Sequence, residues 1–508
     1  MAPKHSDPWK LVIPAPRRCT VDLEAEGFSL PEVVTLFSDA EGGSEVIQAA
    51  LPRIDRICQG TVYRWKRAAD AAPAAVRLTP GDVEEGHYEL AVTSAGVTVR
   101  AGGTAGFSAG LATVVQAVLL LDHGQTVLPA VTILDHPAYP WRGFMVDVAR
   151  HFLPMESLHR VLDVVWLLRL NRFHLHLTDD QGWRLPVSAY PLLTDVGGWR
   201  SDCTSEGGRY GGFYSAGELR ELDSDAAALG IIVVPEIDLP GHASAAITAY
   251  PQIGCSREVP GVETRWGIFP AVISPVSQAA RDFIRTVFAA ATEVFQGPYI
   301  HVGGDEVMTE SWASLTSEAG QEDQLYQQIV RFMTETVLEL GRVPLVWDEA
   351  SRLDLPRDTI ILNWREPEFA GAALERGYRI VLCPQARRTY LDHKHRDTPL
   401  EAGRLSVCTV HDSSRYEPLL YVREALGPDL PGADRVLGGQ GNLWTEGVRF
   451  HSEVEYMGYL RLAAISEGLW TGTPGAAAWS EGFRERLEWW RGRMIASGVN
   501  VYPGAMEA

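Results

Sequence analysis

The sequence predicts an α/β protein in which a (β/α)8 barrel, the TIM-barrel fold, follows a small α+β domain. Residues 136–508 contain eight short apolar runs, several of them separated by stretches of helical period. Polar and aromatic residues follow most of these runs. Nearly continuous apolar strands with mostly helical crossovers indicate a parallel sheet that is covered on both faces, and eight strands can close a barrel.

The first 135 residues predict the small α+β domain. Two alternating segments, 88–93 and 97–100, are joined by Ser94-Ala95-Gly96 and predict a β-hairpin. An Ala- and Leu-rich helix is expected over about 106–121. Because each proline disfavours helix in the residue before it, the proline-containing segment 135–140 should be extended. We therefore expect domains of residues 1–135 and 136–508.

The barrel prediction rests on the order of strands and helices in the second domain. The eight apolar runs are 143–148, 173–178, 231–237, 299–302, 344–347, 359–364, 379–383 and 436–443. Helical periods occur at 157–170, 216–229, 278–295, 322–340 and, less clearly, 367–375.

Composition excludes several classes of protein. The chain has 508 residues, 46% of them hydrophobic, and a formal net charge of −20. This balance favours a large core over disorder, and it disfavours a nucleic-acid-binding surface. We see neither a membrane-spanning run of roughly 20 apolar residues nor a secretory signal at residues 1–16. We expect a cytoplasmic protein, or a secreted one if an export signal has been trimmed.

The six cysteines predict no cross-linked scaffold. They are scattered and form no CxxC pair, which favours neither a zinc site nor a dense disulfide framework. We expect buried free thiols.

Carboxylates and tryptophans follow the apolar runs, where a barrel carries its active site. Adjacent carboxylates at Asp305 and Glu306 should differ in pKa, giving one acid and one anion. Indole faces beside carboxylates are typical of a sugar site, although each residue alone could be core or a salt-bridged strand end. The residues are Arg150 and His151, Asp179 and Asp180, Asp238 and His242, Asp305 and Glu306, Trp347 to Glu349, Trp364 and Arg365, and Trp444 to Glu446.

Six ordered strings carry a resemblance to a known family. They are WRGFMVDVARHF (141–152), NRFHLHLTDDQGWRL (171–185), VVPEIDLPGHASA (233–245), HVGGDEV (301–307), YLDHK (390–394) and GGQGNLWTE (438–446). The chain from about residue 130 onward resembles the family 20 glycoside hydrolases, the β-N-acetylhexosaminidases. The first domain is similar to the small domain that precedes the barrel in that family.

The resemblance implies an exo-acting, retaining hydrolase of terminal N-acetylglucosamine or N-acetylgalactosamine in oligosaccharides or glycoconjugates. It implies Glu306 as the general acid and no cofactor or metal. The substrate's 2-acetamido oxygen would attack the anomeric carbon and form an oxazolinium intermediate. Asp305 would hold the acetamide N–H, and Tyr390 would donate to the acetamide oxygen.

The same resemblance assigns the rest of the pocket. Indoles would surround the acetamide and the sugar face, and polar side chains would bind the hydroxyls or orient the acid. The indoles are Trp347, Trp364 and Trp444; Arg150 would bind the 3- and 4-hydroxyls, Asp392 and Glu446 the 4- and 6-hydroxyls, and Asp179 and His242 would support the acid.

One loop departs from the family pattern. Members commonly carry a tryptophan in a loop that reads roughly TPL followed by Trp-Ala-Gly, whereas residues 398–403 read TPLEAG. The sequence therefore does not predict which residue forms one stacking wall of the site, or which leaving group the enzyme prefers.

Three other functions remain as alternatives. His174 and His176 form an HxH that could bind a metal, but we see no further histidines at the later strand ends around Trp347, Trp364 and Tyr390. A silent carbohydrate-binding protein would lack Glu306, and a retaining glycosidase with its own carboxylate would not need the acetamide. The gluco or galacto preference, the natural glycan and the oligomeric state are not predicted.

Overall fold

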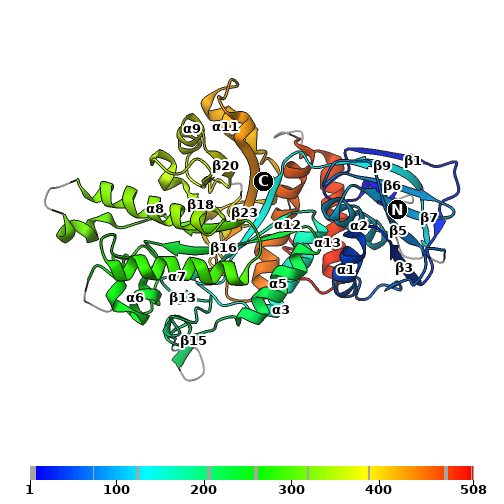
Figure 1. The fold of residues 1–508 in the computed structure, drawn as a ribbon. Coiled ribbons are helices and arrows are strands. Elements are labelled where there is room, and N and C mark those ends of the chain that lie inside the picture. The colour runs from blue at the N-terminus through cyan, green and yellow to red at the C-terminus, as the bar shows by residue number, and fades with distance from the viewer. Residues whose placement is uncertain are drawn as a thin grey trace.

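A computed structural model describes residues 7–72, 74–121, 125–202, 208–256, 261–316, 320–386, 389–473, 479–504 and 506. Figure 1 shows the N-terminal sheet on one side of the molecule and the barrel on the other, with the C-terminal helices between them. The predicted fold class, a (β/α)8 barrel preceded by an α+β domain, is confirmed. The boundary at residue 135 stays a prediction.

The N-terminal part is a seven-stranded mixed sheet. The predicted hairpin is its centre, with Leu90 of β6 opposite Val99 of β7. The predicted helix is α2, which is buried on all sides and packs on the sheet and on the barrel helix α3. In sheet order the strands are β1 (Arg18–Asp22), β9 (Ala130–Asp135), β6 (Tyr88–Thr93), β7 (Gly96–Ala101), β5 (Val76–Pro80), β3 (Val33–Ser38) and β4 (Arg64–Arg67); the helices are α1 (Gly43–Ile57) and α2 (Thr104–Leu119).

Eight parallel strands close the barrel, and each of the eight predicted runs forms one of them. Phe144 of the first strand pairs with Phe173 of the second and with Gly441 of the last, which closes the ring. The strands are β10 (Trp141–Asp147), β11 (Arg172–His176), β16 (Ile232–Leu239), β17 (Tyr299–Gly303), β18 (Val343–Trp347), β19 (Ile360–Asn363), β20 (Arg379–Leu382) and β23 (Val436–Leu443).

Helices cover the outside of the barrel, and all five predicted helical periods are helices. Between β18 and β19 the described residues 348–359 form only a 3-10 turn, Asp348–Arg352. Helix α12 follows the last strand and is buried along nearly its whole length. The helices are α3 (Met155–Leu167), α5 (Ala216–Ala227), α6 (Ser244–Ala249), α7 (Gln278–Val294), α8 (Glu322–Glu339), α9 (Pro367–Glu375), α10 (Val410–Ser414), α11 (Pro418–Leu426), α12 (His451–Thr471) and α13 (Glu481–Ala496).

A buried ion pair joins the two parts of the chain. Asp135 at the end of β9 accepts a hydrogen bond from Arg169 of the barrel at 2.7 Å, and both side chains are fully buried. Tyr88 and Trp470 also donate to this carboxylate, at 2.7 Å and 3.0 Å. Removing one partner of such a buried pair leaves an uncompensated charge, which costs about 3–5 kcal/mol.

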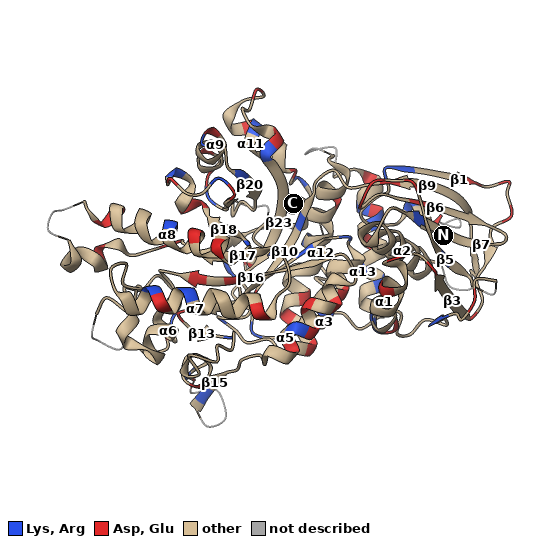
Figure 2. Ribbon diagram, in the orientation of Figure 1, with Lys and Arg blue, Asp and Glu red and all other residues tan. Residues whose placement is uncertain are grey.

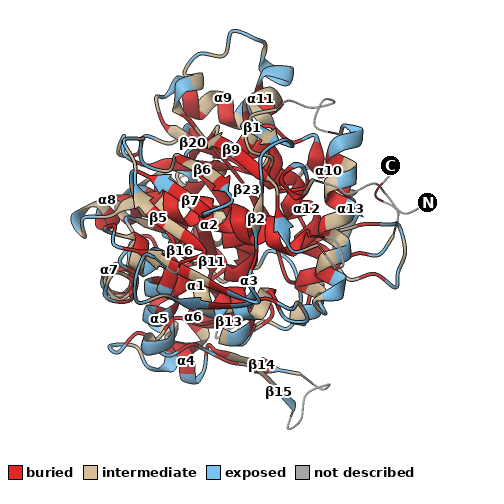
Figure 3. Ribbon diagram, turned by 90° about the vertical axis from the view of Figure 1, so that its right-hand side faces the viewer, coloured by how far each residue is buried: buried red, intermediate tan, exposed pale blue. Residues whose placement is uncertain are grey.

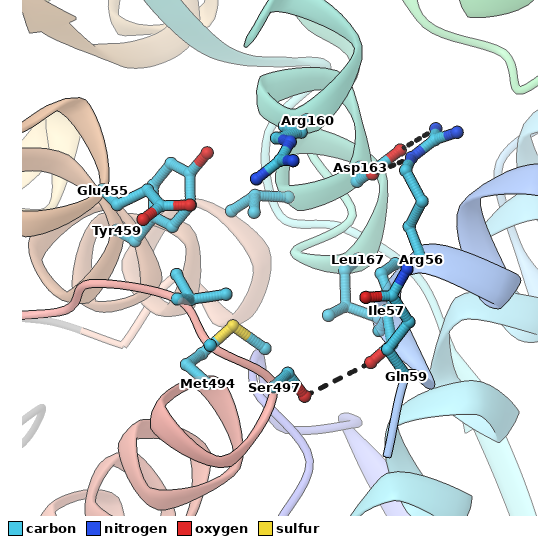
Figure 4. Close-up of a pocket in the computed structure, with 13 residues that line it drawn as sticks. Arg56, Ile57, Gln59, Arg160, Asp163, Leu167, Glu455, Tyr459, Met494 and Ser497 are labelled. Carbon is cyan, nitrogen blue, oxygen red and sulfur yellow. Dashed lines mark hydrogen bonds and ion pairs between the residues drawn. The ribbon is translucent and has the colours of Figure 1, made fainter. Parts of the chain in front are cut away.

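A small cavity of about 120 Å³ lies where α1, α3, α12 and α13 meet (Figure 4). Arg56 binds Asp163 across it through two hydrogen bonds of 2.8 and 2.7 Å, and Ser497 donates to the Ile57 carbonyl. None of the predicted site residues lines this cavity. It is a gap in the packing of helices from the two parts.

The distribution of buried residues agrees with the large apolar core that the composition predicts. Figure 3 shows buried residues concentrated in the middle of the molecule, and Figure 2 shows acidic and basic residues mixed along many elements. Within the described residues, no helix is both long and apolar enough to cross a bilayer. The prediction of buried thiols holds for Cys58, Cys383 and Cys408, but it is wrong for Cys19, which is exposed on the edge strand β1, and for Cys255, which is only partly buried. Cys203 lies outside the described residues.

Candidate active site

A cavity of about 170 Å³ opens where the barrel strands end. Trp347, Tyr390 and Trp444 line this cavity and also belong to a compact cluster of buried apolar residues inside the barrel. The lining residues are Arg150, Asp305, Glu306, Trp347, Trp364, Gln385, Tyr390, Arg404, Trp444 and Glu446. The structure therefore brings most of the predicted site residues together, whereas Asp179, His242 and Asp392 are buried and are absent from this lining.

The turn after β17 places the two adjacent carboxylates. Gly303 has φ 78°, and a Cβ there would overlap the carboxylate of Asp238, so the turn requires glycine. Glu306 itself has φ 49°, a left-handed conformation that a non-glycine residue seldom adopts. Such strain concentrates at functional sites, where the surrounding structure holds it in place.

His242 links these carboxylates to a buried acidic pair. Its Nε2 lies 3.5 Å from Glu306 Oε2 and 3.8 Å from Asp305 Oδ2. Its Nδ1 lies 3.3 Å from Asp179 Oδ1 and 3.2 Å from Asp180 Oδ2. Burial lowers the pKa of His242, but the surrounding carboxylates, Asp179 first, raise it well above its usual value. The surrounding carboxylates thus favour the cationic form of the imidazole.

The two cavity carboxylates have opposite pKa shifts. Burial raises the pKa of Asp305 and the charge of Glu306 adds to this, against the opposing effect of His242. Burial also acts to raise the pKa of Glu306, but the hydrogen bond and charge of His242, helped by Arg150, hold it below its usual value. In the free site Glu306 is thus the stronger acid of the two.

Indoles form the apolar walls. The ring of Trp444 lies 6.0 Å from that of Trp347 and 6.3 Å from that of Tyr390, between ring centres. Trp364 stacks against Tyr390 at 6.2 Å with an interplanar angle of 17°. The indole of Trp347 donates to Glu236 at 2.7 Å, which fixes the orientation of its ring.

Two arginines, Arg150 and Arg404, bind the carboxylates on the polar side of the cavity, and we call this group of residues the polar wall. Arg150 donates to Asp179 at 2.7 Å, and its guanidinium lies 5.0 Å from the centre of the Trp444 ring. Arg404 binds Asp392 Oδ2 at 2.7 Å and Glu446 Oε1 at 3.4 Å. The second oxygens of Asp392 and Glu446 are buried and lack a hydrogen-bond partner among the described residues, and of these two residues only Glu446 lines the cavity.

Sequence reasoning missed Arg404 and Gln385. Gln385 follows the seventh strand, β20, and the position after a barrel strand could have indicated it. Arg404 does not follow a barrel strand; it begins the short strand β22 (Arg404–Val407), which pairs with β21 (His393–Lys394). The pairing of these two short strands and the ion pairs with Asp392 and Glu446 place Arg404 at the cavity.

Histidines cluster under the cavity floor, where His301 of β17 joins the two histidines of the HxH. Glu236 of β16 lies 3.0 Å from His174, 2.7 Å from His176 and 3.0 Å from His301 of β17. Among the described residues, His174, Glu236 and His301 lie close enough to one another to hold an ion. His176 Nδ1 forms a hydrogen bond with the Glu236 carboxylate, whereas His174 Nε2 and His301 Nε2 are buried and lack a hydrogen-bond partner among the described residues. The absence of a metal stays a prediction.

Comparisons with known proteins agree with this arrangement. Residues 139–473 match "Glycosyl hydrolase family 20, catalytic domain", and residues 11–136 match its "domain 2". A β-N-acetylhexosaminidase of Cellulomonas fimi is 35% identical over 79% of this chain and 78% of its own length. A β-hexosaminidase of Porphyromonas gingivalis is 32% identical over 82% of this chain, which spans only 55% of that protein.

Solved structures agree as well. A mutant Streptomyces plicatus β-hexosaminidase in complex with product (GlcNAc) has a TM-score of 0.85 and 28% identity, with 99% of each chain covered. A GH20 β-N-acetylhexosaminidase of Streptomyces coelicolor has a TM-score of 0.83 and 26% identity, with 100% of each chain covered. The family match extends over both parts of the fold and includes every strand of the barrel. The chain therefore belongs to glycosyl hydrolase family 20 and is a glycoside hydrolase.

Proposed function

We propose that this glycoside hydrolase is an exo-acting, retaining β-N-acetylhexosaminidase. Its substrates would be oligosaccharides or glycoconjugates that end in N-acetylglucosamine or N-acetylgalactosamine at the non-reducing end. The observation that carries the proposal is the joining of Asp305, Glu306 and Tyr390 with three indoles in one cavity. Both the names of the relatives and the GlcNAc found with a structural neighbour support it.

In the proposed reaction the substrate supplies the nucleophile. Glu306 protonates the glycosidic oxygen while the bond from that oxygen to the anomeric carbon breaks. The acetamide carbonyl oxygen attacks the same carbon and forms a cyclic oxazolinium ion. Asp305 accepts the acetamide N–H and stabilises its positive charge, and Tyr390 donates to the acetamide oxygen. Water then opens the ring at the anomeric carbon, Glu306 takes the proton of that water, and the configuration is retained.

The remaining residues hold the sugar. Trp347, Trp364 and Trp444 surround the acetamide and exclude water from the reactive ion. The polar wall binds the hydroxyls at the far end of the ring. In this wall Arg150 contacts the 3- and 4-hydroxyls, Asp392 and Glu446 accept from the 4- and 6-hydroxyls, and Arg404 holds both carboxylates; Asp179 and His242 orient Glu306.

Substrate binding has to act against the pKa shifts of the free site. Asp305 must be an anion and Glu306 an acid, whereas their pKa shifts in the free site run the other way. An acetamide N–H bound to Asp305 favours its charged form, and a sugar that excludes water from Glu306 favours its neutral form. Binding thus moves the two pKa values toward the order that the reaction requires.

The test compares three aryl β-glycosides: the N-acetylglucosaminide, the N-acetylgalactosaminide and the glucoside with a 2-hydroxyl. We expect turnover of at least one acetamido substrate and no appreciable turnover of the glucoside. Comparable rates on the glucoside would reject the acetamide mechanism and favour a carboxylate nucleophile of the enzyme. Binding of N-acetylglucosamine without hydrolysis of any of the three would reject the proposed activity.

A further inference from the structure

A second, outer cavity of about 490 Å³ adjoins the catalytic cavity. Both share Arg150, Glu306, Arg404 and Glu446 in their linings. We propose that the outer cavity binds the leaving group, and that Trp266 stacks on the sugar ring or aryl group on the reducing side of the scissile bond. This inference rests on the proposed function, because it takes Glu306 as the acid.

The position of Glu306 between the two cavities identifies the occupant. The acid must contact the glycosidic oxygen, so the scissile bond lies where both cavities reach Glu306. Asp305 and Tyr390, which would hold the acetamide, line only the inner cavity. The sugar that is cleaved off therefore fills the inner cavity, and the group on the other side of the bond extends into the outer one.

Trp266 offers this group a flat apolar surface. Its exposed fraction is 44%, and that of its neighbour Ile268 is 49%. Two large apolar residues that stay exposed beside catalytic carboxylates form the kind of surface that binds a ligand. Among the described residues that line the outer cavity, Trp266 is the only aromatic one.

The indole is held in place before any ligand binds. Its ring centre lies 5.4 Å from that of His151, and the guanidinium of Arg200 lies 5.4 Å from the indole centre. A preorganised ring of this kind loses little conformational entropy on binding.

The backbone beside the indole is tied to the catalytic loops. The Gln181 side chain accepts a hydrogen bond from Arg150 at 3.2 Å and donates to the Arg265 carbonyl at 2.8 Å. The Glu263 amide donates to the Asp180 carbonyl at 3.0 Å. These bonds fix the segment that carries Trp266 relative to the polar wall of the catalytic cavity.

The loop that lacks the family's tryptophan contributes no competing aromatic group. Its residue in the outer cavity is Gly403, whose amide donates to the Gly447 carbonyl at 3.3 Å. Glu401, in the place where the pattern has tryptophan, is buried and accepts a hydrogen bond from the Arg396 amide at 2.8 Å. The stacking wall is thus supplied by the segment before α7 instead.

The experiment measures kcat/KM of wild type and Trp266→Ala on two substrates. One is the β-linked disaccharide of N-acetylglucosamine, whose leaving group is a sugar. The other is the β-azide of N-acetylglucosamine, whose leaving group is too small to reach the indole. We expect Trp266→Ala to lower kcat/KM about tenfold on the disaccharide and to leave the azide within about twofold.

Two further variants act as controls. Trp266→Phe keeps an aromatic face and should retain most of the activity on the disaccharide. Phe213→Ala removes another partly exposed aromatic side chain, which lies outside the described lining of both cavities. It should leave kcat/KM unchanged on both the disaccharide and the azide.

Two results would overturn the inference: equal losses on both substrates after Trp266→Ala, or no loss on the disaccharide. Failure of wild type to hydrolyse the azide would instead count against the proposed function, so the two failures are distinguishable.

Discussion

Replacing His242 by asparagine removes the positive charge that lies beside both cavity carboxylates. Asparagine suits this position because His242 has φ 47°, and asparagine tolerates the left-handed conformation better than most residues. Its short amide can still donate toward Asp179 and Asp180, which His242 contacts through Nδ1. The contact between Nε2 and Glu306 is lost.

The size of the effect follows from the distance of 3.5 Å between His242 Nε2 and Glu306 Oε2. The Glu306 side chain is 34% exposed, so solvent screens this pair, and an effective dielectric constant of about 40–80 gives about 1–2 kcal/mol. This corresponds to roughly one pKa unit. Because His242 lowers the pKa of Asp305 as well, its removal raises the pKa of both carboxylates.

The assay is the pH dependence of kcat/KM on the N-acetylglucosamine disaccharide, which reports ionisations of the free enzyme. On the alkaline side of this profile kcat/KM falls as pH rises, and the apparent pKa of that fall should be about one unit higher in His242→Asn. This holds whether the ionisation belongs to Asp305 or to Glu306, because His242→Asn raises the pKa of both. His451→Asn, which alters a histidine paired with Glu455 in α12, is the matched control and should not change this apparent pKa. An active His242→Asn enzyme with the wild-type apparent pKa would refute the reasoning.

Four other outcomes are expected. Glu306→Gln should lower kcat about 10²–10⁴-fold on the disaccharide and much less on an aryl glycoside with an activated leaving group; equal losses would contradict its role as the acid. Asp305→Asn should lower kcat more than it raises KM, since its charge matters most to the oxazolinium ion, and a change in KM alone would argue against this role. Arg404→Met leaves the buried Asp392 unpaired and should lower kcat/KM about 10–100-fold in steady-state assays; an unchanged value would exclude Arg404 from the polar wall. Burial lowers the pKa of His174 from 6.5 to about 4, so between pH 6.5 and pH 4 the unfolded chain binds a proton that the folded chain does not. The urea midpoint of unfolding should therefore fall as pH drops from 6.5 to 4. His174→Gln should make this fall smaller, and an equal fall in the variant would contradict the role of His174.

The regular part of the fold could be predicted because its residues repeat simple patterns. The eight barrel strands are apolar runs, and α7 shows a clear helical period from its serine cap onward. Helix α12 is buried on every side and so has no polar face that would reveal a period. The short strand β22 was not predicted because its four residues are too few to show a pattern, and only their pairing with β21 makes them a strand.

The candidate site could be predicted where its residues directly follow strands. Asp305 and Glu306 follow β17, and Trp347 ends β18, so strand order alone places them at one mouth. Arg404 was not predicted because its place depends on the path of a loop. The links from His242 to two pairs of carboxylates depend on side-chain directions that no sequence pattern states.

The ion pair between Asp135 and Arg169 has a practical consequence for anyone who shortens this chain. A fragment that begins at the barrel would keep every residue of the catalytic cavity. It would also keep the Arg169 guanidinium, fully buried in the intact chain, with no anion beside it, and would bare the side of α3 that α2 covers. We therefore expect such a fragment to be less stable than the intact chain.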